Sequence, residues 1–240
     1  MSPLTIELVL GLVLFAGAFV QSSVGFGINV IAGPAVVIFA PDLMPGALVL
    51  NGFILPTIQL VRDGVDIHWR PLGWTVLARA VTTPMGVWLV LVLNKAWLGF
   101  MLGMLILMTA GLSVRRVDVR PTRRNALVAG ALSGVTGSSA AVGGPFVALL
   151  FQHERPDRLR STLAMSFLAG GTLSILGLVP SGQLDWSHVR AAAIWAPFVL
   201  AGYLAAGPAR KLLDEARMRA AVLAFCAIAG VVLIVRALFV

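Results

Sequence analysis

Two matching stretches of sequence decide the fold: VGFGINVIAGP at residues 24–34 and VTGSSAAVGGP at residues 135–145. They align without gaps, and each ends in a Gly-Pro pair after a run that contains glycine and small polar residues. Such residues interrupt helices, because glycine admits positive φ and hydroxyl or amide side chains compete for backbone hydrogen bonds. Each stretch therefore predicts a helix that breaks and restarts.

The sequence around these stretches is apolar over lengths that suit a lipid bilayer. Of the 240 residues, 59% are hydrophobic and 12% are charged, about half the charged share of an average soluble domain. Apolar runs of about 18 residues or more predict helices that cross a ~30 Å hydrocarbon core, whereas the strands of a membrane barrel would alternate. The chain is therefore predicted to be an all-α integral membrane protein. Charged residues are absent from residues 8–41, 43–61, 98–114, 125–153, 161–184, 191–209 and 220–235.

The basic residues gather in four short segments, which order the membrane topology. These segments are residues 62–70, 115–124, 155–160 and 210–219, and they hold most of the 18 lysines and arginines. Because cytoplasmic loops carry an excess of Lys and Arg, we expect all four on the cytoplasmic side of a bacterial plasma (inner) membrane, with both termini outside. This placement accounts for the net charge of +8 without a nucleic-acid partner.

An even number of crossings must separate successive cytoplasmic segments. Residues 71–93 and 96–114 supply one pair of spans, and residues 161–179 and 191–209 supply another. Each span is long enough, or nearly so, to cross the bilayer as one helix. Between these two pairs lies the second broken stretch.

The two broken stretches each predict a pair of half-length helices. Residues 125–152 are too few to cross twice as full helices, and they break at residues 136–139. Residues 8–40 break in the same way at residues 21–29. Irregular backbone at membrane depth is tolerated only where protein buries it or where it lines a cavity. We therefore expect a cavity at the breaks.

A second match places both broken stretches in a duplicated chain. DIHW at residues 66–69 resembles QLDW at residues 183–186, and each precedes a long apolar run. We interpret the chain as one membrane domain, with repeat one at residues 4–116, a cytoplasmic linker at 117–124 and repeat two at 125–240. By the charge pattern the repeats have inverted topology, each a broken-helix hairpin plus three transmembrane helices. Inverted repeats with interrupted helices at matching positions are typical of transporter binding sites.

The candidate site is an anion site built from the two breaks. A helix that restarts at the membrane midplane presents unpaired N–H groups and the positive end of its dipole, and we expect restarts at residues 28–29 and 139–140. Glycines there allow close backbone approach and positive φ. Close helix packing and hydroxyl bonding to the preceding turn are the alternative explanation. The predicted substrate-binding residues of the breaks are Gln21, Ser22, Ser23, Gly25, Gly27, Asn29, Thr136, Gly137, Ser138 and Ser139.

Three further residues complete the predicted substrate site. Asn51 and Thr162 occupy equivalent positions in the next helix of each half, where they either face the cavity or bond another helix. Arg79 is the only basic residue well inside a span, which marks it as a functional candidate, although its place near the cytoplasmic end also allows snorkelling. The three histidines lie in connections and are expected to be solvated: His68, His153 and His188.

No catalytic or metal-binding pattern is present. The chain has no HExxH or GxSxG motif, one cysteine and no pair of aspartates within the predicted spans, so we expect no enzyme, metal site or cofactor. Glu7, near the outer end of the first span, is the only acidic residue in a predicted span. A buried carboxylate is therefore not expected to carry a coupling proton.

The repeated Gly-rich break before Pro, together with the two Trp loops, resembles the TauE/SafE family of sulfite and sulfonate exporters. The resemblance covers nearly the whole chain. Two departures are visible: the family's breaks are richer in consecutive glycines, and His68 stands where Asp is typical. Membership implies transport of a small oxidised-sulfur or organic anion, commonly outward. The expected partners are this anion and the lipid bilayer, with a homodimer left open.

Two other functions fit the same residues: a passive anion channel of the same fold and a non-transporting accessory membrane protein. Uptake into proteoliposomes separates a transporter from an accessory protein. Saturation and counterflow separate a carrier from a channel.

Overall fold

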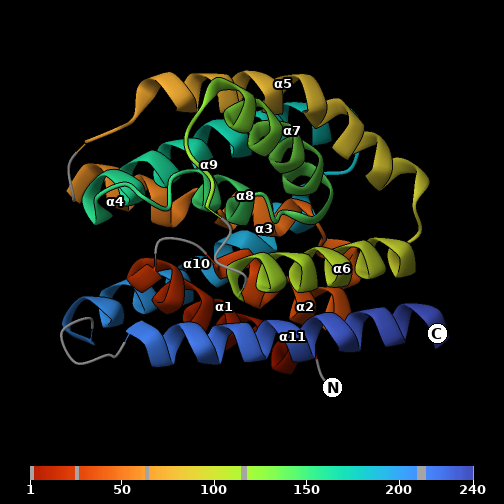
Figure 1. Ribbon diagram of the computed structural model, residues 1–240. Helices are drawn as coiled ribbons and strands as arrows, with labels where there is room; N and C mark the ends of the chain where they lie inside the picture. The colour runs from red at the N-terminus through yellow and green to blue at the C-terminus, as the bar shows by residue number, and fades with distance from the viewer. Residues whose placement is uncertain (1–2, 25–26, 63–64, 115–117, 210–214, 240) are drawn as a thin grey trace.

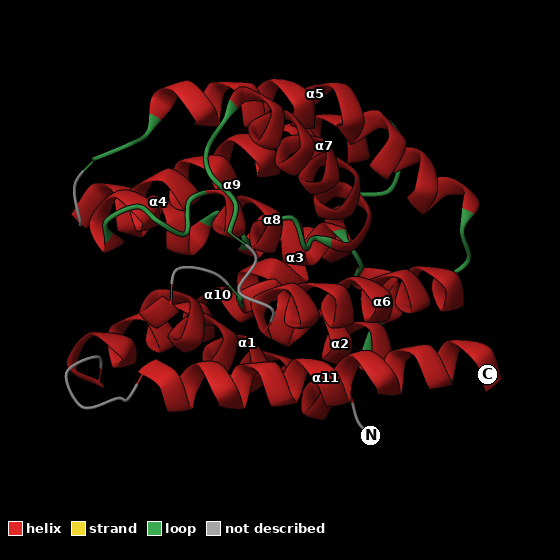
Figure 2. Cartoon of the chain, viewed as in Figure 1, coloured by secondary structure: helices red, strands yellow, loops and turns green. Residues whose placement is uncertain are grey.

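The computed structural model describes residues 3–24, 27–62, 65–114, 118–209 and 215–239. Over these ranges every regular element is a helix and no strand occurs (Figure 2), which confirms the predicted all-α class. A short 3₁₀ helix, η1 (Pro41–Leu43), lies between the second and third α-helices. In chain order the α-helices are α1 (Pro3–Val24), α2 (Ile28–Phe39), α3 (Gly46–Asn51), α4 (Ile54–Arg62), α5 (Trp69–Val92), α6 (Lys95–Val114), α7 (Arg123–Ala140), α8 (Gly144–Leu150), α9 (Pro156–Leu178), α10 (Trp186–Ala209) and α11 (Glu215–Phe239).

The long helices have the length and composition of membrane spans. At about 1.5 Å per residue, a helix of 20 residues reaches about 30 Å, the thickness of the hydrocarbon core. Within the described ranges, four helices carry windows that are long and apolar enough to cross: Leu4–Ser23, Trp69–Val92, Pro156–Leu178 and Trp186–Gly207. Shorter apolar helical stretches are Ile28–Phe39, Gly46–Arg62 (which contains both α3 and α4), Lys95–Gly111 and Leu223–Phe239.

The helices form two groups, and each group mixes the two halves of the chain. In Figure 1, α4, α5, α7, α8 and α9 make the upper group, α1, α2, α6, α10 and α11 make the lower group, and α3 lies between them. The most extensive helix pairs are α5 with α7, α1 with α10, and α6 with α11. Matching the halves in chain order pairs α1 with α7, α5 with α10 and α6 with α11. Under this matching, the contact of α5 with α7 corresponds to the contact of α10 with α1, and the contact of α6 with α11 corresponds to itself. The same helix pairs thus recur when the halves are interchanged, which supports a duplicated chain.

Glycines let these three helix pairs approach closely. A Cβ on Gly130 of α7 would lie 2.2 Å from a carbonyl oxygen of α5, and one on Gly202 of α10 would lie 2.3 Å from a carbonyl oxygen of α1. In the third pair, a Cβ on Gly103 of α6 would lie 2.8 Å from a carbonyl oxygen of α11. Small residues at such contacts are how membrane helices gain packing energy without a hydrophobic driving force between them.

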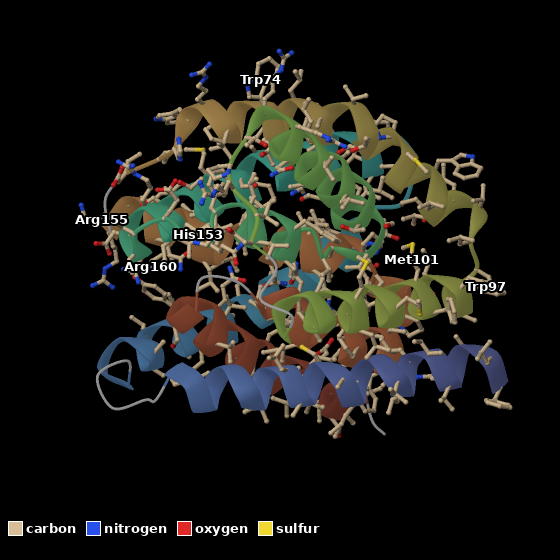
Figure 3. The ribbon with its side chains drawn as sticks, in the orientation of Figure 1. Trp74, Trp97, Met101, His153, Arg155 and Arg160 are labelled. Carbon is tan, nitrogen blue, oxygen red and sulfur yellow. The ribbon has the colours of Figure 1, made fainter. Side chains whose placement is uncertain are left out.

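Ion pairs gather three of the basic segments on one face of the molecule. Arg158 Nε lies 2.9 Å from Asp66 Oδ1, and His153 Nε2 lies 2.6 Å from Asp118 Oδ1. The connections at residues 65–68, 118–122 and 151–155 therefore lie together, and we call this end the basic face. Figure 3 shows His153, Arg155 and Arg160 there. Residues 210–214, in the fourth basic segment, lie outside the described residues. The cytoplasmic assignment of the basic face stays a prediction.

The connections with few basic residues lie at the opposite face. Lys95 forms an ion pair with Asp42, which joins the α5–α6 turn to η1. His188, at the start of α10, packs against Gly46 at the start of α3. Figure 3 shows Trp97 at the end remote from the labelled basic residues. The structure thus separates the loops in the way that their charges separate them.

The expectation of half-length helices at both breaks was wrong for the first member of each pair. α1 has 22 residues and α7 has 18, so each continues through its polar residues. The hydroxyl groups of Ser23, Thr136 and Ser139 donate to the backbone carbonyl four residues earlier, at 3.0, 2.8 and 2.6 Å. Hydroxyls that bond to their own helix in this way need no break in the backbone. Of the four helices at the two breaks, only α2 and α8 are short, with 12 and 7 residues.

The apolar run at residues 43–61 forms two helices rather than one span. α3 ends at Asn51 and α4 begins at Ile54. Pro56 lacks the N–H that would bond the Gly52 carbonyl, and its ring crowds that carbonyl. The helix is therefore interrupted about one turn before the proline, which leaves Gly52 facing the interior of the protein.

Candidate functional site

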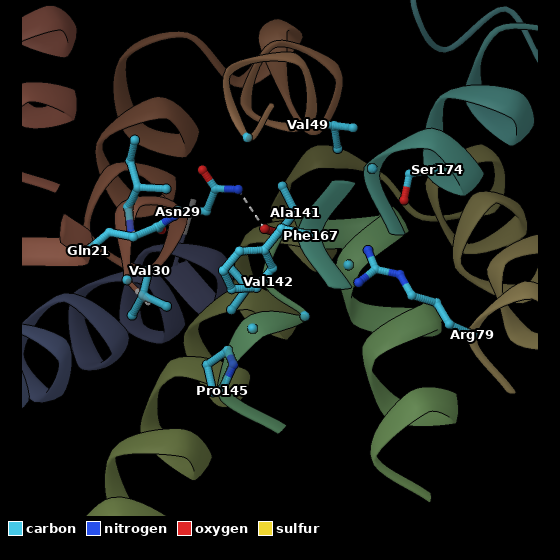
Figure 4. Close-up of a pocket in the computed structure, with 17 residues that line it drawn as sticks. Gln21, Asn29, Val30, Val49, Arg79, Ala141, Val142, Pro145, Phe167 and Ser174 are labelled. Carbon is cyan, nitrogen blue, oxygen red and sulfur yellow. Dashed lines mark hydrogen bonds between the residues drawn. The ribbon is translucent and has the colours of Figure 1, made fainter. Parts of the chain in front are cut away.

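A cavity of about 60 Å³ lies where the two breaks meet (Figure 4). Its walls come from the α1–α2 break, the α7–α8 break and the facing sides of α3, α5 and α9. One water molecule needs about 10–15 Å³ of such volume, so the cavity admits an anion of a few heavy atoms. Five predicted substrate-binding residues line it: Gln21, Gly27, Asn29, Arg79 and Gly137.

The first break is shaped by Gly27 and capped by Gln21. Gly27 has a φ of +130°, which glycine adopts readily and other residues rarely adopt. α2 begins at the next residue, where the sequence predicted the restart. Gln21 Oε1 accepts a hydrogen bond from the Ile28 N–H at 3.1 Å. The N–H groups of Asn29 and Val30 have no acceptor within the helix. Gln21 thus serves as a cap, and the first turn of α2 keeps donors toward the cavity.

The second break lies at residues 141–143, later than the predicted restart at 139–140. Ala141 turns the chain with φ of +57° after α7 has continued through Ala140. α8 has seven residues and carries Pro145 in its first turn, so it is too short to act as a long helix dipole. Positive φ was also expected at Gly25 and Gly137. Gly137 is helical instead, and Gly25 lies outside the described residues.

A hydrogen bond between described residues joins the two breaks. Asn29 Nδ2 donates to the Ala141 carbonyl oxygen at 2.8 Å, as the dashed line in Figure 4 shows. The buried Oδ1 of Asn29 accepts no hydrogen bond from the residues that the structure describes. Because Asn29 belongs to the first half of the chain and Ala141 to the second, this contact joins the halves at the edge of the cavity.

Arg79 extends from α5 to the cavity and is buried, with 5% of its surface exposed (Figure 4). Its Nη1 donates to Ser133 Oγ at 2.9 Å, and its buried Nε has no hydrogen-bond partner in the described part of the chain. Within the described ranges Arg79 forms no ion pair with a carboxylate. Because the guanidinium group is buried in the protein and does not extend to the membrane surface, snorkelling was the wrong explanation. Arg79 lies about 15 Å along α5 from Trp69, farther than its side chain reaches.

Three glycines enclose the guanidinium group. A Cβ on Gly170 of α9 would lie 1.9 Å from Arg79 Cζ, and one on Gly137 of α7 would lie 2.6 Å from Nη2. A Cβ on Gly143 would lie 2.4 Å from Ser133 Oγ and 3.3 Å from Nη1. A side chain at Gly170 or Gly137 would displace the group, and one at Gly143 would displace Ser133, its hydrogen-bond partner. The glycines thus hold the guanidinium in place, and its Nε–Nη2 edge makes no bond to the described residues.

The rest of the wall is electrically neutral. Arg79 is the only charged side chain among the described residues that line the cavity. Gln21, Asn29 and Ser174 are polar, and Val49 and Phe167 present apolar surface. Across the described ranges, no three His, Cys, Asp or Glu side chains come together as metal ligands. The site is therefore one buried positive charge in a small neutral enclosure.

The hydroxyl residues of the breaks do not line the cavity. Ser23, Thr136 and Ser139 bond to their own helices, which is the alternative that the sequence left open. Ser138 Oγ lies 2.9 Å from Ser174 Oγ and so links α7 to the cavity wall of α9. Ser22 is buried away from the cavity.

Asn51 and Thr162 also have structural roles. Asn51 Nδ2 donates to the Ala47 carbonyl oxygen at 3.1 Å. Thr162 Oγ1 accepts from the His68 N–H at 3.1 Å, which ties α9 to the connection before α5. Neither residue lines the cavity. Between the two readings of these residues, the structure favours bonding within the protein.

His188 is buried, contrary to the expectation that all three histidines are solvated. Its exposed fraction is 6%, and its Nδ1 lies 2.8 Å from Asp185 Oδ1. Hydrogen bonds from Ser187 and His188 hold the pKa of Asp185 below its usual range. His68 and His153 are more exposed and pair with acidic residues of the basic face. These groups organise the loops and stand outside the cavity wall.

Sequence reasoning missed the parts of the wall that come from α3 and α9. A usable signal was present in the adjacent pair Gly170-Gly171, because paired glycines within a span indicate close approach. Ser133, the partner of Arg79, is a single serine without a distinguishing pattern. The missed wall residues from these helices are Val49, Gly52, Phe167, Gly171 and Ser174.

Comparison with known proteins gives two similarities. A family model described as "Sulfite exporter TauE/SafE" matches residues 9–233 of the chain. A curated relative from Comamonas testosteroni, named "Probable inner membrane transporter protein TsaS", is 27% identical over 128 residues. That alignment covers 51% of this chain and 54% of the relative, so the match spans about half the length of each. No solved structure matches significantly.

Proposed function

Because the chain belongs to the TauE/SafE family of membrane transporters, we propose that it moves a small anion outward, such as sulfite, a sulfonate or a related organic anion. The anion binds between the two breaks, with Arg79 as its counter-ion. The observation that carries this proposal is the burial of Arg79 without a carboxylate partner in the described part of the chain.

A buried guanidinium group needs a negative partner. Arginine stays protonated in proteins, and the effective cost of removing such an ion from water is several kcal/mol. A bound anion offsets that cost through charge-assisted hydrogen bonds. The Nε–Nη2 edge of Arg79 presents two donors in one plane, which suits two oxygens of a sulfite or sulfonate group. The first turn of α2 adds the N–H groups of Asn29 and Val30.

The interleaved packing supports a transport mechanism based on repeats. We infer that residues 4–116 and 125–240 are inverted repeats joined by a linker at 117–124. The cavity lies where the two repeats meet, so rocking of one group of helices against the other would expose it to each side in turn. In this arrangement the basic face is cytoplasmic, and both termini lie outside a bacterial plasma (inner) membrane.

Uptake of radiolabelled sulfite into proteoliposomes tests the proposal. Arg79→Gln should lower uptake about 100-fold or more, since truncating one partner of a buried charge pair costs 2–5 kcal/mol. Arg236→Gln is the matched control, because Arg236 lies on α11 and donates to the Ile38 carbonyl oxygen at an exposed position. Saturation and counterflow are expected for a carrier. Wild-type uptake by Arg79→Gln would refute the anion site.

A further inference from the structure

We propose that the cavity accepts singly charged anions and excludes doubly charged ones. This inference rests on the proposed function and narrows its substrate class. Hydrogen sulfite, sulfonates and monocarboxylates are ligands, whereas the sulfite dianion, sulfate and phosphate-type dianions are not. The feature that carries it is one fixed guanidinium group in a wall that is otherwise neutral over its described residues.

Among the described residues, no second positively charged side chain lines the cavity. The helices packed most closely on α5 are α7 and α9. Their charged side chains stand in the first turns, at the basic face, and none of them lines the cavity. These residues are Arg123, Arg124, Asp157, Arg158 and Arg160.

The charge balance of the loaded cavity follows from this count. A monoanion neutralises Arg79. A dianion leaves one negative charge, of which the positive end of the α2 dipole offsets about half. An uncompensated charge in a low-dielectric enclosure is strongly disfavoured. The hydrogen-bond donors for the ligand are limited as well. Nη1 of Arg79 already donates to Ser133, and the close packing at Gly137 and Gly170 leaves no space for another side chain beside the guanidinium group.

Two ligands of nearly equal shape isolate the effect of charge. Methyl sulfate stays a monoanion across the neutral range, whereas methyl phosphate loses its second proton near pH 6, like phosphoserine. We would measure the dissociation constants of both by calorimetry on the purified full-length protein at about pH 5 and about pH 8. The ratio of the two constants cancels pH effects that arise from the protein's own histidines.

If only the monoanion binds, the affinity for methyl phosphate falls with its monoanion fraction. That fraction drops to about 1% at pH 8 for a second pKa near 6. The dissociation constant of methyl phosphate divided by that of methyl sulfate should therefore rise about 100-fold between about pH 5 and about pH 8. A ratio that stays within about 3-fold would overturn this inference while leaving the anion site in place. Failure of both ligands to bind at either pH would overturn the proposed function as well.

Arg79→Lys separates charge from geometry. Lysine keeps the single positive charge but lacks the planar fork. It should weaken methyl sulfate binding and preserve the pH dependence of the ratio. Equal binding of both ligands by this variant at about pH 8 would show that charge count does not set the selectivity.

Discussion

The substitution Gly170→Ala places a methyl group against the guanidinium group of Arg79. The new Cβ would lie 1.9 Å from Cζ, 2.2 Å from Nη1 and 2.3 Å from Nε. Because ordinary contacts between carbon atoms begin at about 3.5 Å, the group must move by roughly 1.5 Å. That shift breaks the 2.9 Å hydrogen bond to Ser133 and turns the Nε–Nη2 edge away from the cavity.

The expected effect on binding is much larger than the effect on folding. A misplacement of about 1 Å at a functional group can cost about 100-fold, so anion affinity and uptake should fall by about that factor. The clashing atoms end a flexible side chain, and overpacking of this kind costs about 1–3 kcal/mol. Alanine in a helix recovers about 1 kcal/mol relative to glycine. The variant should therefore insert and fold.

Calorimetry with methyl sulfate measures the affinity, and thermal unfolding reports the fold. Gly73→Ala is the matched control, because Gly73 lies on α5 and a Cβ there meets no atom within 4 Å. Both variants add one methyl group to a helical glycine. Wild-type affinity in Gly170→Ala would show that the guanidinium position does not determine binding, and the reasoning about the glycine enclosure would fail.

Three further predictions test the topology, the breaks and the energy coupling. Single cysteines at residues 118–122 and 154–159, in a Cys226→Ala background, should react with an impermeant reagent from the same side, since Asp118 contacts His153; reaction from opposite sides would contradict the inverted-repeat topology. Gly27→Val and Gly137→Val should abolish transport with expression largely intact. Valine at residue 27 disfavours the φ of +130° that shapes the first break, and valine at residue 137 displaces the guanidinium group of Arg79. Normal transport by both variants would exclude anion binding at the breaks. Glu7→Gln should retain gradient-driven transport, because Glu7, the only acidic residue in a predicted span, lies near the outer end of that span and not at its centre; anion binding with lost pH dependence would identify Glu7 as the coupling group.

Length and composition were enough to predict four of the long helices, α5, α6, α9 and α10. The ends of α5 and α6 lie within two residues of the predicted spans, because the bilayer sets the length of an apolar run. α9 and α10 begin about one turn earlier than predicted. Their first turns contain charged or polar residues, which extend a helix into water beyond its apolar part. The loop charges likewise anticipated that three of the four basic segments lie together.

The details of the site depended on contacts that no local pattern encodes. Whether Ser139 ends a helix or bonds to Val135 is decided by a choice between two hydrogen bonds of similar strength. Whether Arg79 snorkels or points inward is decided by Ser133 and Gly170, which belong to the other half of the chain. The sequence therefore identified Arg79 as a candidate, while its direction required the packing of α5 on α7.

The pairing of α1 with α10 has a consequence for biosynthesis. These helices are separated by about 160 residues, which take about 10–30 s to synthesise at 5–20 residues per second. During that interval the residues of α1 that contact α10, such as the buried Ala18 against Gly202, lack the surface that covers them in the finished protein. The first half alone also lacks α7, the main partner of α5. Membrane insertion of either half can therefore precede folding, but stable folding must wait for both halves to share one membrane.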